Sequence, residues 1–387
     1  MDSPSLTTLA ACQRLTSPQA MAGFVSLWQV LRIWFFRAAL FTVGCVIAVA
    51  LLIRYRAEGN LMTIFLAYLP IWVLALPLLG ILLASMLFLC WRSAALSFSC
   101  AMLIPFWLGG YSFFYGPLPP QEPGTHTLTV MTYNRGQGSD KILTACASAH
   151  RPDIAVFQDA GRRLLQLAAL PEFYQHQYKH QSGEFVLLSR WPLLENEALQ
   201  LEWPFGKNGF CNAGTRSVID WHGQEVVVYN IHFPTPRDLL YWYAKRGTFL
   251  YGVLGLIPNT PLHARHQHYL AYWVARVGLA AQLAVRVRAE SKPVILLGDL
   301  NAPPLGQGYS LLGAVLQDAQ KTAGNGFGFT FPGNFKFIGN LLAPWLRIDH
   351  VFASSHWEIL SCIRCSSKIS QHLPVVSMLK IKQIENI

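Results

Sequence analysis

Val294-Ile-Leu-Leu-Gly-Asp-Leu-Asn301 carries the strongest structural signal in this chain. Four aliphatic residues in a row predict a strand that is buried on both faces, and Gly298 lets the backbone turn at its end. Asp299 and Asn301 then emerge on either side of Leu300. A carboxylate and a carboxamide placed in this way can hold a water molecule and orient a phosphate. The same residues also fit a simple strand-end turn that is capped by Asx side chains.

Charged residues are distributed unevenly along the 387-residue chain. Only 13% of the residues are charged, 52% are hydrophobic, and residues 1–120 contain six arginines and two acids as their only charges. The remainder has the composition of a soluble domain that is long enough to bury a large core. We therefore expect a tail (1–37), transmembrane helices (38–115), a Pro-rich linker (116–124) and a globular domain (125–387).

Three apolar segments are candidate membrane spans: Ala38–Ile53, Leu61–Leu89 and Ala94–Phe114. A span needs roughly 20 mostly apolar residues, so the first is slightly short unless it borrows the aromatic residues before it. The second is long enough to tilt, and Pro70 and Pro77 are positioned to kink it. The sequence predicts a three-helix transmembrane region that precedes the globular domain.

The arginines near the spans set the expected orientation. Arg32, Arg37 and Arg92 fall on one side of three spans, and Arg54 and Arg56 fall on the other. The positive-inside rule then favours a cytoplasmic N-terminus and an exported catalytic domain. We expect an integral protein of a bacterial inner membrane with its catalytic domain in the periplasm. The eight cysteines do not decide the compartment.

Polar residues end several further predicted strands in the second part of the chain. Predicted strands at 128–134, 153–159 and 225–232 end in Asn134, in Gln158 and Asp159, and in Asn230 and His232. A period of two places Asn230 and His232 on one face. These strands alternate with helix-like stretches at 141–150 and 264–290, which predicts two packed sheets covered by helices. Ligands in such folds gather where the strand ends converge.

Seven motifs in this order resemble the endonuclease/exonuclease/phosphatase (DNase I-like) superfamily. They are Thr132-Tyr-Asn134, Phe157-Gln-Asp159, Leu188-Ser-Arg-Trp-Pro192, Tyr229-Asn-Ile-His232, Gly298-Asp-Leu-Asn301, Arg347-Ile-Asp349-His350 and Ser370-Gln-His-Leu-Pro374. They span about Leu128 to Met378, nearly all of the globular part. The resemblance implies an α/β fold, a four-layer α/β/β/α sandwich of two mixed sheets. It also implies hydrolysis of a phosphate ester with a divalent metal ion, Mg²⁺ or Mn²⁺.

The resemblance also implies a role for each matched residue. Asp159 and Asn134 would hold the metal ion, which prefers oxygen ligands. Five residues would be catalytic. Asp299 would activate the attacking water, and Asn301 would bind a phosphate oxygen or fix Asp299. His372 would donate to the phosphoryl oxygen while Asp349 holds its ring, and His232 would be a second histidine near the phosphate. Asn230 and Arg190 would bind the substrate, although Arg190 also suits a structural ion pair.

Two positions depart from the family pattern. Asp159 stands where the family usually has Glu, and Gln371 replaces the usual Asp before the final His, which favours one metal ion over two. Simpler interpretations also remain open at this level: Asp349 can pair with Arg347, His232 can be a core histidine, and Asp159 can cap a helix.

The nature of the substrate follows from charge and from an insertion at 234–261. The chain carries a net charge of +10, which favours an anionic substrate or lipid surface. The insertion combines aromatic, aliphatic and basic residues, which fits contact with the lipid bilayer or a hydrophobic lid. The leading hypothesis is a membrane-anchored phosphodiesterase or phosphatase acting on a phosphate ester, with a lipid-linked phosphate as one candidate substrate. The alternatives are a membrane-tethered endonuclease acting on nucleic acid, and an inactive domain that binds phosphorylated ligands or acts as a scaffold.

Overall fold

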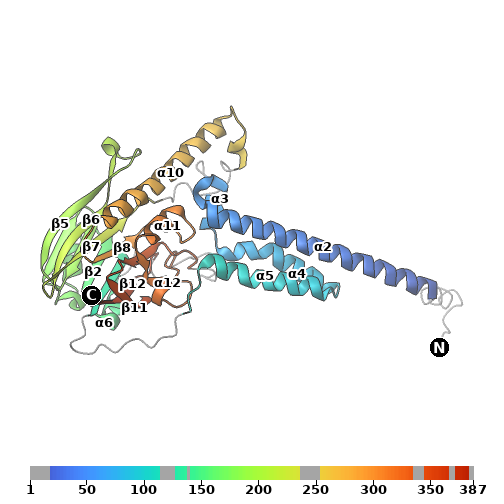
Figure 1. Ribbon diagram of the computed structural model, residues 1–387, viewed down its shortest axis with the longest axis horizontal. Helices are drawn as coiled ribbons and strands as arrows, with labels where there is room; N and C mark the ends of the chain where they lie inside the picture. Colours follow the sequence, from blue (N-terminus) through green and yellow to red (C-terminus); the bar gives the residue numbers. More distant parts are fainter. Residues whose placement is uncertain are drawn as a thin grey trace, which may run out of the picture. The chain divides into compact units, whose positions relative to one another are not determined.

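The computed structural model describes residues 18–113, 127–136, 140–235, 253–333, 344–365 and 371–382 (Figure 1). The chain forms two compact units: Met1–Leu51 with Ile71–Trp107, and Leu52–Pro70 with Leu108–Ile387. We refer to them as the helical unit and the catalytic unit. Residues 1–17 of the predicted tail, the predicted linker at 116–124 and much of the insertion at 234–261 lie outside the described residues.

The helical unit contains most of α2 (Pro18–Arg56) and α5 (Trp91–Gly109), together with η2 (Ile71–Ala75) and α4 (Leu76–Leu87). Phe88, in the turn between α4 and α5, stacks on Phe35 of α2 with ring centroids 4.6 Å apart. Arg32 Nη2 donates a 2.6 Å hydrogen bond to the carbonyl of Leu89 in the same turn. The hydrogen bond satisfies a backbone carbonyl that the tight turn leaves without a helical partner, and the ring contact packs the turn against α2.

Two of the described helices are long and apolar enough to cross a membrane, Trp28–Gly59 and Pro261–Arg288. A third candidate is the pair Leu61–Tyr68 and Ile71–Leu87, which is bent by 104°. The predicted count of three spans is therefore not confirmed. The predicted span 61–89 breaks at Leu69, which is extended because Pro70 follows it. The predicted third span corresponds to α5, which is not among the candidates.

The connector between α2 and η2 belongs to the catalytic unit rather than to the helical unit. It consists of η1 (Ala57–Gly59) and α3 (Leu61–Tyr68). The side chain of Asn60 caps α3: its Oδ1 accepts hydrogen bonds of 2.9 and 3.0 Å from the N–H groups of Met62 and Thr63. Leu61 and Ile64 are fully buried, so α3 packs as part of this unit's interior.

Two six-stranded sheets form the centre of the catalytic unit. The first has the order β11-β12-β1-β2-β4-β3, with β1 (Thr127–Asn134), β2 (Ile154–Gln158), β3 (Tyr178–Ser182), β4 (Phe185–Ser189), β11 (Trp357–Arg364) and β12 (Val375–Ile381). The second has the order β5-β6-β7-β8-β10-β9, with β5 (Leu193–Glu202), β6 (Phe210–Trp221), β7 (Gln224–His232), β8 (Val294–Asp299), β9 (Gln317–Asp318) and β10 (Asp349–Ala353). Both are mixed, because β1 pairs with β2 and β7 with β8 in parallel.

Helices cover the outer faces of both sheets (Figure 1). They are α6 (Asp140–His150), α7 (Leu164–Ala168), α10 (Pro261–Arg288) and α11 (Gln307–Gly313). The unit also contains the short 3-10 turns η3 (Pro171–Phe173), η4 (Lys207–Gly209) and η5 (Leu254–Leu256). Helix α12 (Ala319–Ala323) instead contributes Ala319 and Ala323 to the core cluster between the two sheets. The first sheet packs on α6 and α7, and the second on α10 and α11. The predicted four-layer α/β/β/α sandwich is confirmed.

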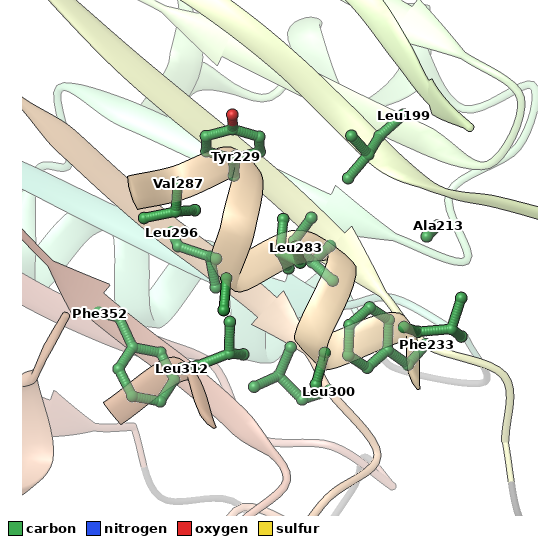
Figure 2. Packing of buried hydrophobic residues seen from close by; sticks show 14 of the residues in the cluster. Leu199, Ala213, Tyr229, Phe233, Leu283, Val287, Leu296, Leu300, Leu312 and Phe352 are labelled. Atoms are coloured by element: carbon green, nitrogen blue, oxygen red, sulfur yellow. The ribbon is translucent and has the colours of Figure 1, made fainter. Parts of the chain in front are cut away.

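Helix α10 shows how the sequence builds an outer layer. Leu279, Leu283 and Val287 recur at every fourth position and enter one core cluster with Leu296 of β8 (Figure 2). Each fully buried aliphatic side chain stabilises the fold by roughly 1.5–3 kcal/mol. The same face accounts for the apolar composition of this helix, which covers the second sheet.

Gly298 has a different role from the predicted turn, because it lies inside β8 with φ of 144°. A Cβ atom on this residue would lie 1.9 Å from the carbonyl oxygen of Ile231 in β7. Glycine therefore allows β8 to approach β7 closely. The parallel register then sets Asp299 beside His232, and the antiparallel register of β10 sets Asp349 on its other side.

Candidate active site

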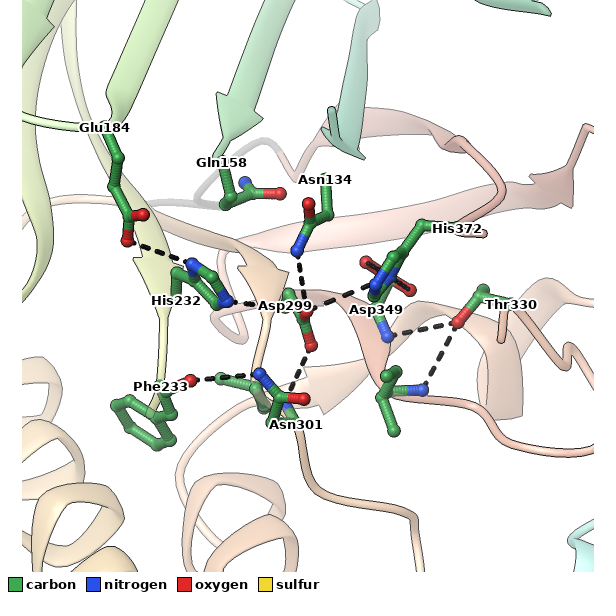
Figure 3. Close-up of polar contacts among 12 residues, drawn as sticks. Asn134, Gln158, Glu184, His232, Phe233, Asp299, Asn301, Thr330, Asp349 and His372 are labelled. Atoms are coloured by element: carbon green, nitrogen blue, oxygen red, sulfur yellow. Dashed lines mark hydrogen bonds and ion pairs between the residues drawn. The ribbon is translucent and has the colours of Figure 1, made fainter. Parts of the chain in front are cut away.

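Polar residues at the ends of five strands face the space between the two sheets. In β1, β2, β7, β8 and β10, alternate side chains enter the central core, and the residues that continue those rows point the same way. They are Asn134, Gln158, Asn230, His232, Asp299 and Asp349. Figure 3 shows Asn134, His232 and Asp349, which come from both sheets, around Asp299. The site is thus the polar edge of the inter-sheet core.

Asp299 lies at the centre of the site and is only 1% exposed. Its Oδ2 accepts a 2.9 Å hydrogen bond from Asn134 Nδ2, and its Oδ1 accepts a 2.8 Å bond from the N–H of Asn301. The same Oδ2 lies 3.7 Å from His232 Nε2 and 3.8 Å from His372 Nδ1 (Figure 3). The carboxylate is therefore fixed in direction between two imidazole rings.

A second acid, Asp349, orients His372. The Nδ1 atom of His372 lies 3.0 Å from Asp349 Oδ2, and the N–H of Asp349 donates a 3.2 Å bond to the hydroxyl of Thr330. Burial lowers the pKa of His372, but the charges of Asp349 and Asp299 outweigh burial and raise it. Burial, with the charge of Asp349, raises the pKa of Asp299. The site therefore favours an imidazolium beside a carboxylate of increased basicity.

A second group of ligand atoms lies beside the first. One ligand atom from each of Asp159, Glu184 and His232 lies within 4.8 Å of the other two. The Nδ1 atom of His232 is 2.9 Å from Glu184 Oε1. Burial lowers the pKa of His232, but the bond to Glu184 and the charge of Asp299 raise it to about 9. His232 is thus a cation that connects this group to Asp299.

Glu184 is the member of the site that sequence reasoning missed. It follows Gly183 in the turn between β3 and β4, and its carbonyl accepts a 2.9 Å bond from the N–H of Ala160. This contact brings the turn beside Asp159, whose φ of 51° is unusual for a residue other than glycine. An acid in a glycine turn is a weak signal in sequence, because turns commonly carry solvated acids.

Two residues that were predicted to bind the substrate, Asn230 and Arg190, do not lie among the groups around Asp299. The Asn230 side chain is fully buried. Its Oδ1 accepts a 2.7 Å hydrogen bond from Gln158 Nε2, and its Nδ2 donates to two backbone carbonyls, so the side chain has a structural role beneath the site residues. Arg190 pairs with Asp153 at 3.0 Å. Asp153 precedes β2, whereas Asp159 follows it, so Arg190 lies at the opposite end of the strand. The structure therefore does not bring Arg190 together with the other predicted site residues, because the ion pair holds it at that end.

The remaining oxygen atoms fit a divalent cation. Among the residues that the structure describes, none donates a hydrogen bond to the buried Oδ1 of Asn134. This atom and Asp159 Oδ2 point at one small space: a Cβ on Gly136 would lie 3.1 Å from the first and 3.5 Å from the second. Burial raises the pKa of Asp159, so a cation that neutralises its charge would relieve this cost. The donor set consists of the hard oxygens that Mg²⁺ and Mn²⁺ prefer.

The chain is similar to solved structures at low sequence identity. One is an endonuclease/exonuclease/phosphatase from Beutenbergia cavernae (17% identity, 66% of this chain and 72% of that chain covered, TM-score 0.44). Others are a mannosyl-6-phosphatase from Bacteroides thetaiotaomicron (20%, 65% and 99%, 0.43) and truncated TDP2 from Caenorhabditis elegans (15%, 66% and 97%, 0.42). A search of curated protein sequences gives no match.

The matched region of the family model starts and ends at residues of the motifs that were identified in the sequence. The model described as "Endonuclease/Exonuclease/phosphatase family" matches residues 132–372, more than half of the chain. The match runs from Thr132, two residues before Asn134, to His372, and so covers both ligand groups of the site. The chain belongs to the endonuclease/exonuclease/phosphatase family, whose members are phosphoester hydrolases.

Proposed function

We propose that this protein is a membrane-anchored, metal-dependent hydrolase of phosphoric esters. The observation that carries the proposal is the position of Asp299, a buried carboxylate fixed between the imidazole rings of His232 and His372. An acid that is buried beside a second acid, with oriented imidazoles around it, is a site built for proton transfer rather than for stability. The simpler interpretation, a capped turn, does not account for two converging histidines.

Asp159, Glu184 and the side-chain oxygen of Asn134 would hold the ion, which we propose to be Mg²⁺ or Mn²⁺. When bound, the ion would supply positive charge at the phosphoryl oxygens and increase the acidity of water. The aspartate side chain is one methylene shorter than the family's usual glutamate. Glu184 would supply a second carboxylate beside Asp159 and so complete the ligand set. Gln371 offers no carboxylate before His372, which supports a single ion.

The protein's own residues divide the remaining chemistry. Asp299 would orient the attacking water and accept its proton, and burial has raised its pKa toward the range in which a base is effective at neutral pH. His372 would donate from Nε2 to a phosphoryl oxygen, because Asp349 holds its Nδ1. His232 would add positive charge near the phosphate. Asn301 would fix Asp299 through its backbone N–H, since its side chain is bonded to the carbonyl of Phe233.

A lipid-linked phosphate is the substrate class that the structure supports best. The connector formed by η1 and α3 joins two apolar helical segments and packs within the catalytic unit against the same helix, α10, as η5. Near the N-terminal end of α10, Leu254, Leu256 and Ile257 are 39%, 65% and 56% exposed. Exposed aliphatic side chains on a unit that is joined to apolar helices fit contact with lipid better than contact with a polyanion.

The compartment of the catalytic unit is a separate proposal. Cys146 of α6 and Cys365 form a disulfide that links positions 219 residues apart, and Cys362 remains a free buried thiol. Disulfides of this kind persist in oxidising compartments. The disulfide supports the exported orientation that the arginine distribution predicts. A reporter that is active only in the cytoplasm, fused after Ile387 and giving signal, would contradict it.

The proposed reaction is tested with the full-length protein in detergent and bis-p-nitrophenyl phosphate. We expect turnover with Mg²⁺ or Mn²⁺ and none with a chelator. We expect Asp299→Ala and His372→Ala to abolish turnover, whereas the matched surface variants Asp220→Ala and His180→Ala keep it. Folded wild-type protein that turns over no phosphate ester with either ion would identify a ligand-binding domain instead.

The substrate class is tested by offering plasmid DNA and phospholipid vesicles to the same preparation. Hydrolysis of a phosphate ester in the vesicles, with intact plasmid, is the expected result. Cleavage of the plasmid with unchanged lipid would support a membrane-tethered endonuclease and contradict the lipid assignment.

A further inference from the structure

Asn301 is the point at which the active site meets the connector between the first two apolar helical segments. Its N–H donates to Asp299 Oδ1 at 2.8 Å, and its carbonyl oxygen accepts two further bonds from the other side. One comes from the hydroxyl of Tyr68 at 2.6 Å, and the other comes from Arg276 Nη2 at 2.7 Å. A single residue thus transmits contact from α3 to the proposed catalytic base.

The backbone of Asn301 adopts a left-handed conformation, which asparagine tolerates better than most residues. Its φ is 48°, in the left-handed region that residues other than glycine and a few polar types rarely adopt. The side-chain amide donates to the carbonyl of Phe233 at 3.0 Å, which fixes only the side chain. The carbonyl bonds from Tyr68 and Arg276 fix the peptide plane that follows Asn301. Arg276 Nη2 also donates a 3.4 Å bond to the carbonyl of Leu300, in the preceding peptide plane that carries the N–H bonded to Asp299.

Tyr68 is itself held rigidly at the end of α3. Its ring packs edge-on against Trp273 with centroids 5.4 Å apart, and its own carbonyl accepts a 3.2 Å bond from Trp345 Nε1. The guanidinium of Arg276 stacks over the same Trp273 ring at 4.6 Å. Tyr68 and Arg276 are 8% and 4% exposed. Two buried donors on one carbonyl form a built contact rather than a chance surface encounter.

We propose that Tyr68 is a positioning residue of the active site, acting through the Asn301 carbonyl on the direction of Asp299. This inference rests on the proposed function of Asp299 as the base. The connector, which joins two apolar helical segments, then helps to position the catalytic residues. The protein would lose activity, although not its fold, when this one hydroxyl is removed.

The test compares Tyr68→Phe with two matched variants of the full-length protein in detergent. Tyr309→Phe removes another buried tyrosine hydroxyl, which contacts Asp318 and Arg347. Glu58→Gln weakens a different connector contact, the 3.0 Å bond from the N–H of Gly308. We expect Tyr68→Phe alone to lower kcat for bis-p-nitrophenyl phosphate, by about tenfold with unchanged KM, because only the transition-state geometry is affected.

A second measurement does not depend on turnover. Amide hydrogen exchange of a peptide that covers Leu297–Ala302 should increase in Tyr68→Phe and stay at the wild-type level in Tyr309→Phe and Glu58→Gln. Thermal unfolding of each variant checks that the fold is retained. Wild-type exchange in Tyr68→Phe would overturn the proposal, and so would equal losses of kcat in all three variants. If the wild-type protein hydrolyses nothing, the proposed function fails, while the exchange data still decide the positioning role.

Discussion

Two buried aspartates of the second sheet, Asp299 in β8 and Asp318 in β9, have opposite surroundings. Asp318 is 6% exposed and receives hydrogen bonds of 2.9 and 2.7 Å from Arg347 Nη1. It also contacts the hydroxyl of Tyr309 and caps α12 through the N–H of Gln320 at 2.8 Å. Asp299 instead has no arginine partner among the described residues, and lies beside two histidines and a second acid, Asp349. The negative charge of Asp318 is therefore compensated by a fixed cation, whereas that of Asp299 is not.

The pKa shifts express the same contrast. Burial alone would raise the pKa of Asp318, but the charge of Arg347 outweighs it and the pKa is lowered. Burial raises the pKa of Asp299, and the charge of Asp349 adds to it. Burial therefore does not distinguish a functional acid from a structural one in this protein. The distinction is whether the surrounding groups neutralise the charge or leave it in need of a proton or a cation.

The largest expected effect is on activity. Asp299→Asn should lower kcat about 10²–10⁴-fold, because the base is lost, while the melting temperature is unchanged or higher, because the repulsion with Asp349 is relieved. Asp318→Asn should do the reverse, lowering the melting temperature and leaving kcat per folded molecule intact. Steady-state kinetics and differential scanning fluorimetry check both. Equal kinetic losses in the two variants would remove the contrast.

A large loss of stability is expected at the compensated aspartate. Arg347→Met leaves Asp318 buried without its cation and should cost about 3–5 kcal/mol in the free energy of unfolding. The double variant Arg347→Met/Asp318→Asn should recover part of this cost, since no unpaired charge remains. Denaturant titration measures the cycle. A double variant that is less stable than Arg347→Met alone would argue against charge compensation as the cause.

A smaller effect is expected on the metal concentration that the enzyme requires when Glu184 is changed. Glu184→Gln should raise the Mg²⁺ or Mn²⁺ concentration for half-maximal activity by about 10–100-fold, because one anionic ligand becomes neutral. Glu225→Gln, on the outer part of β7, is the control and should keep the wild-type requirement. Metal titrations of kcat decide the outcome, and an unchanged requirement in Glu184→Gln would exclude Glu184 from the ligand set.

The smallest expected effect is a pH dependence of stability. The pKa of Asp318 is lower in the folded state than in the unfolded state, where it is about 3.9. Its stabilising contribution is therefore complete above the unfolded pKa and is lost as the pH falls through the folded pKa. The difference in melting temperature between wild-type protein and Asp318→Asn should be constant near neutral pH and shrink in acid. A difference that grows as the pH falls would reverse the assigned sign.

The layers of the catalytic unit were predictable because local patterns encode them. The aliphatic run at 294–297 became β8, and the helix-like stretch 264–290 became α10 at Pro261–Arg288. The period of two placed Asn230 and His232 on one inner face. Asp299 and Asp349 lie together because β8 and β10 are neighbours in one sheet. Asn134 of β1 and His372, just before β12, reach them from the other sheet.

Other features depend on contacts that no local pattern encodes. The predicted span 61–89 is a uniformly apolar run, and hydropathy does not distinguish a lipid-facing helix from α3, which is buried in the catalytic unit. Arg190 followed a strand like a site residue, but its partner Asp153 lies at the opposite end of β2. Glu184 and the Cys146–Cys365 disulfide join segments far apart in the chain.

The sequence by itself determined the family, the two-sheet architecture and most of the residues at the site, because strand periodicity and ordered motifs are local properties. The tertiary structure decided which acids are compensated and which are left to bind a cation or a proton. It also decided that Tyr68, in an apolar helix, holds Asn301. Charge balance and hydrogen bonding between distant segments depend on distances in space, and these exist only after the sheets have packed.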